Sequence, residues 1–140
     1  MSDHTEDPIV QRMMKEDAFS QWLGIEVLES GPGISRLQMK IRPEMINGFG
    51  VGHGGIAFSL ADSALAFASN AHGRLSLALD VSISFPAPVR EGDILTAHAE
   101  QLALTERTGL YLIRVTNQDH RTVAIFKGTV YRTAKEWSSL

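Results

Sequence analysis

The sequence contains no cysteine, and this absence excludes several kinds of site. Without thiols the chain can form no disulfide, no thiolate nucleophile and no cysteine-bound zinc or iron–sulfur centre. The lack of disulfides fits a reducing compartment, and the first residues lack the basic-then-apolar order of a secretory signal. We therefore expect a cytoplasmic protein.

Positive charge and long apolar runs are scarce as well. The 13 basic residues face 16 acidic ones, which leaves a net charge of −3, so we expect no nucleic-acid partner and no anionic lipid surface. The longest apolar stretch, residues 56–68, is shorter than the roughly 20 residues that a membrane-spanning helix needs, so we expect no membrane partner. The five histidines show no metal-ligand spacing, and no metal site is expected.

What the chain does contain suits one folded domain spanning residues 1–140. Hydrophobic residues make up 44% and charged residues 21% of the sequence, which is typical of a globular protein. Asp7-Pro8 is typical of a helix N-cap followed by a first-turn proline. It predicts a short N-terminal helix that follows a tail and ends near residue 18. The core of the domain is expected at about residues 22–132.

The apolar pattern then predicts an α+β fold. Alternating apolar and polar residues predict two strands, at about 25–29 and 34–42, which the breaker cluster 30–33 joins into a hairpin. Residues 56–68 predict one long buried helix. Further strands are predicted at about 77–85, 93–103, 110–117 and 122–132. This order favours an antiparallel sheet of five to six strands wrapped around one central helix.

Residues 47–55 contain five glycines immediately before the predicted buried helix. Glycines let the backbone approach a ligand closely, and a helix N-terminus offers unpaired N–H groups with a positive dipole end. Gly50-x-Gly52-x-x-Gly55 also matches the dinucleotide-binding pattern, but that pattern needs a βαβ unit with a parallel sheet. The segment therefore predicts an oxyanion or anion site and no nicotinamide or flavin cofactor.

Asp62 is the only formally charged residue between His53 and His72. A solvated helix face would normally carry Lys, Glu and Arg, whereas the neighbours of Asp62 on its face are small, which suggests that another body lies close above it. A partly buried carboxylate has a perturbed pKa and suits a general base or a nucleophile. We favour a catalytic role over a structural one. The small residues on this face are Ser59, Ser63, Ala66 and Asn70.

The spacing between the glycine-rich segment and Asp62 predicts that two copies of the chain assemble. Asp62 follows Gly54 by eight positions, or roughly 12 Å along a helix at about 1.5 Å per residue. One small reacting carbonyl cannot touch both groups of the same chain. Two such helices packed antiparallel about a two-fold axis would place Gly54 of one chain beside Asp62 of the other. The spacing therefore favours an obligate dimer with two composite sites.

Three motifs follow one another along the chain: Asn47-Gly48-x-Gly50-x-x-His53-Gly54-Gly55, Leu60-Ala61-Asp62-Ser63-Ala64 and Phe85-x-x-Pro88-Val89-x-x-Gly92-Asp93. Their order resembles that of the hotdog-fold acyl-CoA thioesterases, in particular the phenylacetyl-CoA thioesterase (PaaI-type) family. The resemblance runs from Trp22 to about Arg132. It implies a hotdog fold, a homodimer or a dimer-of-dimers tetramer, and hydrolysis of an acyl-CoA thioester without any cofactor beyond the CoA of the substrate.

The resemblance also implies roles for individual residues. Asp62 would be the acidic catalytic residue, Gly54 the backbone donor to the thioester carbonyl, and Asn47 the polar residue beside the reacting centre. His53 would have a positioning role, with a general base as the alternative. The basic side chains of Arg90 and Arg107 would bind the CoA phosphates. The expected substrate-binding residues are Gly55, Phe49, Ser63, Phe85, Pro88, Val89, Arg90, Arg107, Thr108 and Gly109.

Several alternatives stay open at this point. The acyl group is expected to be phenylacetyl or hydroxyphenylacetyl, with medium-chain acyl groups as the fallback, and Asp62 could be a general base or a nucleophile. A hydratase or dehydratase and a non-catalytic acyl-CoA binding module are the other functions considered. Serine hydrolase chemistry is disfavoured because no Gly-x-Ser-x-Gly is present. Four residues could line an aromatic acyl pocket or belong to the core: Phe49, Phe58, Leu65 and Phe67.

Overall fold

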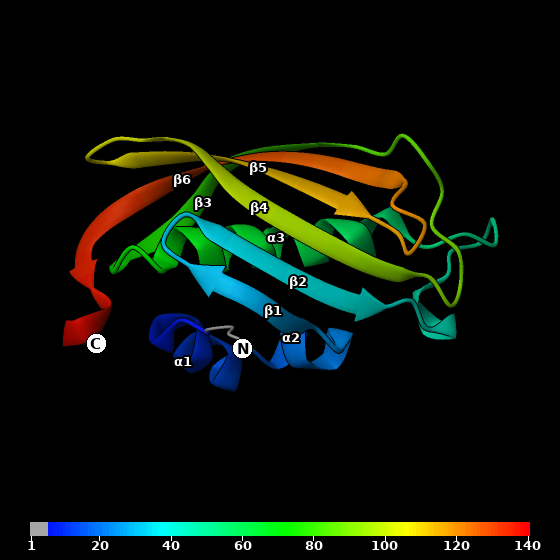
Figure 1. Cartoon of the computed structure of the whole chain (residues 1–140), viewed down its shortest axis with the longest axis horizontal. Helices are drawn as coiled ribbons and strands as arrows, with labels where there is room; N and C mark the ends of the chain where they lie inside the picture. The colour runs from blue at the N-terminus through cyan, green and yellow to red at the C-terminus, as the bar shows by residue number, and fades with distance from the viewer. Residues whose placement is uncertain (1–5) are drawn as a thin grey trace.

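The computed structural model describes residues 6–140, so most of the predicted N-terminal tail lies outside the described residues. A six-stranded sheet curves around the long helix α3, Gly54–Asn70 (Figure 1). The strand order is β1-β2-β4-β5-β6-β3, and every neighbouring pair is antiparallel. The predicted hotdog-type α+β fold is confirmed. The strands are β1 Glu26–Gly31, β2 Ile34–Lys40, β3 Arg74–Ser84, β4 Ile94–Leu104, β5 Thr108–Thr116 and β6 Thr122–Glu136.

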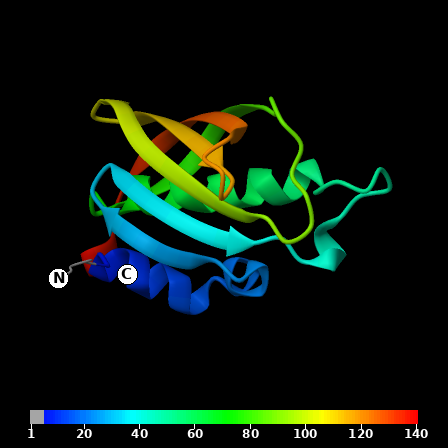
Figure 2. The ribbon, with the colours of Figure 1, turned by 45° about the vertical axis from the view of Figure 1, so that its right-hand side comes forward.

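Helix α3 lies in the concave face of the sheet, where Figure 2 shows it along the trough. Leu60, Ala64 and Phe67 are completely buried, which explains why the sequence of this segment is almost uniformly apolar. The Ser35 hydroxyl of β2 donates a hydrogen bond of 2.8 Å to the Ala64 carbonyl and ties the sheet to the helix. The residues of the sheet that complete the core include Leu37, Met39, Leu95, Tyr111, Ile113, Val115 and Phe126.

The N-terminal segment forms two helices. The predicted short helix is confirmed, although it ends at Glu16, and a second helix that was not predicted follows it. Helix α1, Pro8–Glu16, is separated from α2, Ala18–Leu23, by Asp17, whose backbone is not helical. The Asp17 carboxylate accepts the Ser20 N–H at 2.9 Å and caps α2, which is the usual preference of aspartate at a helix start. The predicted cap at Asp7 is confirmed, since its carboxylate accepts the Ile9 N–H at 2.8 Å.

The two ends of the described chain lie side by side. Arg12 of α1 donates to the carbonyl of Trp137 at 2.8 Å and its guanidinium lies over the Trp137 ring. Trp137 begins a short 3-10 helix, Trp137–Ser139, and a second one, Pro43–Met45, follows β2. Figures 1 and 2 both show the C-terminal turn beside α1. These contacts hold the C-terminal turn against α1.

Strand β3 lies at an edge of the sheet and pairs only with β6. No strand within residues 6–140 pairs with the other edge of β3. Its side chains are unusually exposed for a strand with this composition. Leu77 is 54% exposed and Leu79 is 64% exposed. An open edge with exposed apolar side chains is a surface on which another chain can pair.

Candidate active site

The glycine-rich loop before α3 is folded around the side chain of Asn47. The Asn47 Oδ1 atom accepts the N–H groups of Phe49 at 2.8 Å and Val51 at 3.3 Å, and the Asn47 N–H donates to the Val51 carbonyl at 2.8 Å. Gly50 has a φ of 82°, a conformation that favours glycine. The side-chain nitrogen of Asn47, Nδ2, makes no hydrogen bond to any of residues 6–140. Its predicted contact with the reacting centre therefore stays a prediction.

The first N–H groups of helix α3 differ in whether they have an acceptor. The His53 ring caps the helix, because its Nδ1 atom accepts the Gly55 N–H at 2.9 Å, and the His53 carbonyl accepts the Ile56 N–H. No group in residues 6–140 accepts a hydrogen bond from the Gly54 N–H. This donor lies at the positive end of the helix dipole, where a developing oxyanion is stabilised. The His53 contact is of the kind that a positioning role needs.

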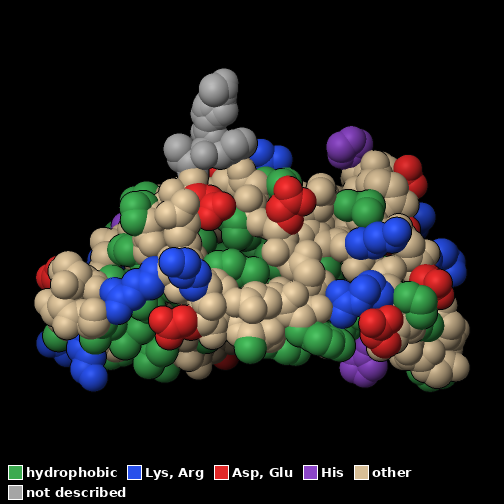
Figure 3. All heavy atoms as spheres, turned by 90° about the horizontal axis from the view of Figure 1, so that it is seen from below, with side chains coloured by type: hydrophobic (Ala, Val, Ile, Leu, Met, Phe, Trp, Pro, Cys, Tyr) green, Lys and Arg blue, Asp and Glu red, His purple; other side chains and the backbone are tan. Residues whose placement is uncertain are grey.

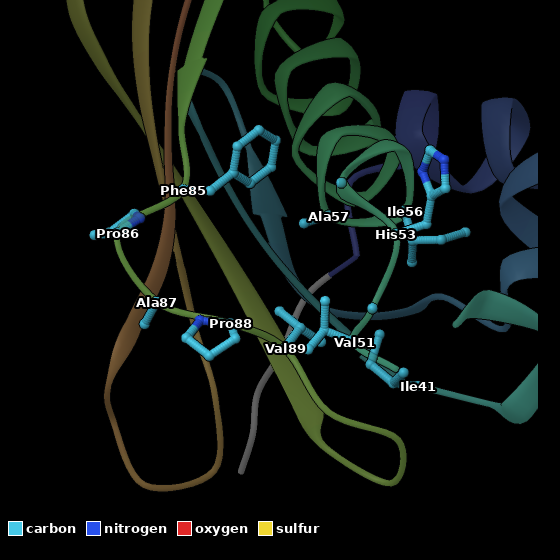
Figure 4. A pocket seen from close by; sticks show the side chains of 12 residues that line it. Ile41, Val51, His53, Ile56, Ala57, Phe85, Pro86, Ala87, Pro88 and Val89 are labelled. Carbon is cyan, nitrogen blue, oxygen red and sulfur yellow. The ribbon is translucent and has the colours of Figure 1, made fainter. Parts of the chain in front are cut away.

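A cavity of about 400 Å³ opens in front of this helix start, between α3 and the segment that follows β3 (Figure 4). The Gly52 N–H donates to the Val89 carbonyl at 2.7 Å and closes one side. The Phe85 ring lies against the first turn of α3, where a Cβ on Gly54 would come within 3.2 Å of it. The lining is mostly apolar: Ile41, Val51, Gly52, His53, Gly54, Ile56, Ala57, Phe85, Pro86, Ala87, Pro88 and Val89.

Asp62 lies more than two turns further along α3 and is half-buried. Burial raises the pKa of its carboxyl group, and the negative charge of Asp17 raises it further. No described side chain forms a hydrogen bond or an ion pair with it. It borders a second cavity, of about 290 Å³, which does not include Gly54. The two predicted catalytic groups thus border different cavities of one chain.

The predicted CoA-binding segments are also far apart. Arg90 lies in the loop before β4, and Arg107 lies in the hairpin after it. Figure 1 shows these two connections at opposite ends of the sheet. Strand β4 has 11 residues, and a strand of that length spans roughly 35 Å at about 3.3 Å per residue. Thr108 and Gly109 lie with Arg107, so one chain cannot bring all these residues to one CoA.

Three further predicted residues have different surroundings. Ser63 is buried, and its hydroxyl lies 2.8 Å from that of Ser20. This contact assigns Ser63 to the packing of α2 and not, within this chain, to a substrate contact. Phe49 is 91% exposed at the tip of its loop and lines neither cavity. Gly55 is exposed beside Gly54, and its N–H is occupied by His53.

The aromatic residues on α3 belong to the core. Phe67 is completely buried, and Phe58 packs edge-on against Phe126 with a centroid distance of 5.3 Å.

Sequence reasoning missed two apolar residues, Ile41 and Val51, that line the first cavity. It also missed Trp137, whose indole N–H donates to Asn70 Oδ1 at 2.9 Å and which borders the cavity beside Asp62. No local pattern in the sequence signals this contact.

Comparisons with known proteins agree with this architecture. The model of the thioesterase superfamily matches residues 49–124. The chain is 41% identical to a putative esterase of Archaeoglobus fulgidus, over 89% of this chain and 81% of the relative. It is 38% identical to the acyl-coenzyme A thioesterase PaaI of Escherichia coli, over 86% of each chain. The structure of E. coli PaaI, from the phenylacetic acid degradation operon, matches with a TM-score of 0.88 and 36% identity, over 90% of this chain and 91% of that one.

An antiparallel sheet of six strands wrapped around one long helix is the arrangement of a hotdog-type fold. The chain belongs to the thioesterase superfamily. The resemblance to PaaI-type thioesterases that the motifs predicted is confirmed. No helix within residues 6–140 is long and apolar enough to cross a membrane.

Proposed function

We propose that the protein hydrolyses acyl-CoA thioesters to a free acid and CoA. The observation that carries this proposal is the unpaired Gly54 N–H, which lies at the start of α3 on the wall of an apolar cavity. An apolar cavity with one convergent backbone donor suits an acyl group whose carbonyl oxygen is the reacting polar atom. Membership of the thioesterase superfamily and the similarity to E. coli acyl-CoA thioesterase PaaI support the same reaction.

In the proposed reaction, the thioester carbonyl accepts a hydrogen bond from the Gly54 N–H. Asp62 removes a proton from a water molecule, whose oxygen attacks the carbonyl carbon. The negative charge that develops on the carbonyl oxygen is stabilised by the Gly54 N–H and the helix dipole. When the carbonyl re-forms, the C–S bond breaks and the CoA sulfur takes the proton. The raised pKa of Asp62 makes its carboxylate a stronger base. The reaction needs no cofactor, and we place it in the cytoplasm.

A homodimer is part of this proposal because one chain separates the required groups. Gly54 and Asp62 border different cavities, and Arg90 and Arg107 lie at opposite ends of β4. Figure 3 shows that hydrophobic side chains stay uncovered in a hollow near the middle of the face seen from below. Pairing across the open edge of β3 and the small-residue face of α3 would bring Gly54 and Arg90 of one chain to Asp62 and Arg107 of the other. The dimer is the smallest assembly that completes the site.

For the acyl group we propose an aryl-acetyl group such as phenylacetyl or hydroxyphenylacetyl. The support is the similarity to the protein from the phenylacetic acid degradation operon and the position of the Phe85 ring beside Gly54, on the wall of the same cavity. An aromatic ring prefers offset or edge contacts with another ring. A panel of aryl and alkyl CoA esters tests this choice through kcat/KM. A more than tenfold preference for medium or long alkyl chains would reject it.

The reaction itself is tested with Asp62→Asn, which keeps the size of the side chain and removes the base. We expect kcat for thiol release to fall about 100-fold or more, with KM little changed, because the base acts in the transition state. Asp119→Asn, in the exposed turn before β6, is the matched control and should keep wild-type activity. Wild-type turnover by Asp62→Asn would exclude the proposed role of Asp62.

A further inference from the structure

Asp17 is held in a fixed position between the N-terminal helices and α3. Its Oδ1 atom accepts the Ser20 N–H at 2.9 Å, and its Oδ2 atom accepts the Ser20 hydroxyl at 2.6 Å. Ser20 is completely buried, and its oxygen lies 2.8 Å from the Ser63 hydroxyl oxygen. Ser63 follows Asp62 directly on α3. Two hydrogen bonds therefore connect the Asp17 carboxylate to the turn of α3 that carries Asp62.

The negative charge of Asp17 is not neutralised where it is held. Both of its carboxylate oxygens bind neutral donors from Ser20, and no cation in residues 6–140 forms an ion pair with it. A carboxylate bonded to neutral groups keeps its full charge, so it repels a second carboxylate nearby. The charge of Asp17 accordingly raises the pKa of Asp62, and this adds to the larger rise that burial causes.

The other elements around Asp62 bring no titratable side chain to its cavity. Helix α1 contributes Met13, strand β3 contributes residues 75–78, β6 contributes Val130, and the last turn contributes Trp137. Arg12, which stacks on Trp137, directs its guanidinium nitrogens to the carbonyls of Trp137 and Leu140. Within the described chain, Asp17 is thus the charged group that acts on Asp62.

We propose that Asp17, held by Ser20 and Ser63, is a positioning residue that acts on Asp62 across the contact between α2 and α3. This inference rests on the proposed function, in which Asp62 is the base. Two tasks follow for Asp17. Its hydrogen bonds fix the turn of α3 on which Asp62 stands, and its charge favours the protonated form of Asp62. A stronger base at this position removes the proton of water more readily.

The test removes the charge of Asp17 and follows Asp62 directly. Asp17→Asn and Asp17→Ser both keep an oxygen that can cap α2. Either variant can be used for the test, provided that it folds like the wild-type protein. The Asp62 carboxyl carbon is titrated by NMR, with Asp62→Asn used to assign its signal, and the pH dependence of kcat/KM is measured with the same samples. We expect the NMR midpoint and the acid limb of the pH profile both to move to lower pH.

Two comparisons separate this charge effect from a merely structural one. Asp7→Asn removes a cap carboxylate from α1 that binds Ile9 and Val10 in a similar way, and it should move neither quantity. Asp17→Glu keeps the charge and should restore the wild-type pH profile. An unchanged Asp62 midpoint in the neutral Asp17 variants would overturn the inference. A midpoint that moves while the acid limb stays in place would uphold the action of Asp17 and reject Asp62 as the base.

Discussion

Burial and the charge of Asp17 raise the pKa of Asp62 above its ordinary value of 3.8. The folded protein therefore holds this proton to higher pH than the unfolded chain does. It follows that the favourable contribution of Asp62 to folding is complete at low pH and is lost as the pH rises above 3.8 and through the raised pKa. At neutral pH the ionised carboxylate is a cost to the fold.

The raised pKa of Asp62 gives a prediction about stability. Asp62→Asn should increase the free energy of unfolding at pH 7, because it removes a carboxylate that is ionised in partly buried surroundings. The gain should shrink toward zero near pH 3, where the carboxyl is protonated in both states. Urea unfolding from pH 3 to pH 7, at one protein concentration, measures it. Asp119→Asn is the exposed control, and a gain that does not depend on pH would contradict the explanation.

Gly52 permits a close approach that any larger residue prevents. A Cβ there would lie 2.8 Å from Val89 Cγ1 and 3.4 Å from the Val89 carbonyl oxygen. Gly52→Ala should therefore destabilise the protein by about 1–3 kcal/mol and lower activity by displacing the segment that carries Phe85. Gly48→Ala is the matched control, since nothing lies within 4 Å of a Cβ at that position. Thermal unfolding and kcat/KM test this prediction, and equal effects of both variants would refute it.

At the scale of elements, the start of α3 depends on the His53 ring. His53→Ala removes the acceptor of the Gly55 N–H and should cost about 1 kcal/mol of stability. His53→Ser restores an N-cap oxygen and should recover most of that loss. If His53 only positions the helix start, His53→Ser should also recover kcat. Recovery of stability without recovery of kcat would instead assign the histidine ring a direct part in the reaction.

Most elements were predictable because each one repeats its local pattern. The alternation of apolar residues located the strands, and the uniformly apolar run located α3, with ends within a few residues of those observed. The second N-terminal helix, α2, was not predicted, because Phe19, Trp22 and Leu23 continue the helical spacing of α1 and mark no separate element. A capping carboxylate stops one helix and starts the next without changing the apolar period.

At the scale of the whole molecule, the site was predictable only as separate pieces. Residues 51–54 of the glycine-rich loop and the segment 85–89, which belong to two separate motifs, line one cavity. By contrast, Ser63 shares a motif with Asp62 but faces Ser20. The Trp137–Asn70 contact joins residues 67 positions apart. Such placements depend on how α2 and the end of the chain pack against α3, and no local spacing encodes that packing.

The composite site gives the last prediction, which needs two inactive variants. Gly54→Pro removes the N–H donor at the first position of α3, where proline is well tolerated. The preceding residue fits as well, since His53 has a ψ of 135°, in the extended range that a following proline requires. Gly54→Ala is the matched control, because it adds the Cβ near Phe85 and keeps the N–H. It should stay far more active than Gly54→Pro.

Mixing inactive Gly54→Pro subunits with inactive Asp62→Ala subunits should then restore activity. In a mixed dimer, one of the two sites joins an intact Gly54 donor to an intact Asp62. With equal amounts and random pairing, about half of the dimers are mixed, so the whole mixture has about a quarter of the wild-type number of working sites, and purified mixed dimers have about half. Differently tagged subunits, refolded together and purified through both tags, provide the mixed dimers for the thiol-release assay. If verified mixed dimers stay inactive, both groups act within one chain and the site is not shared.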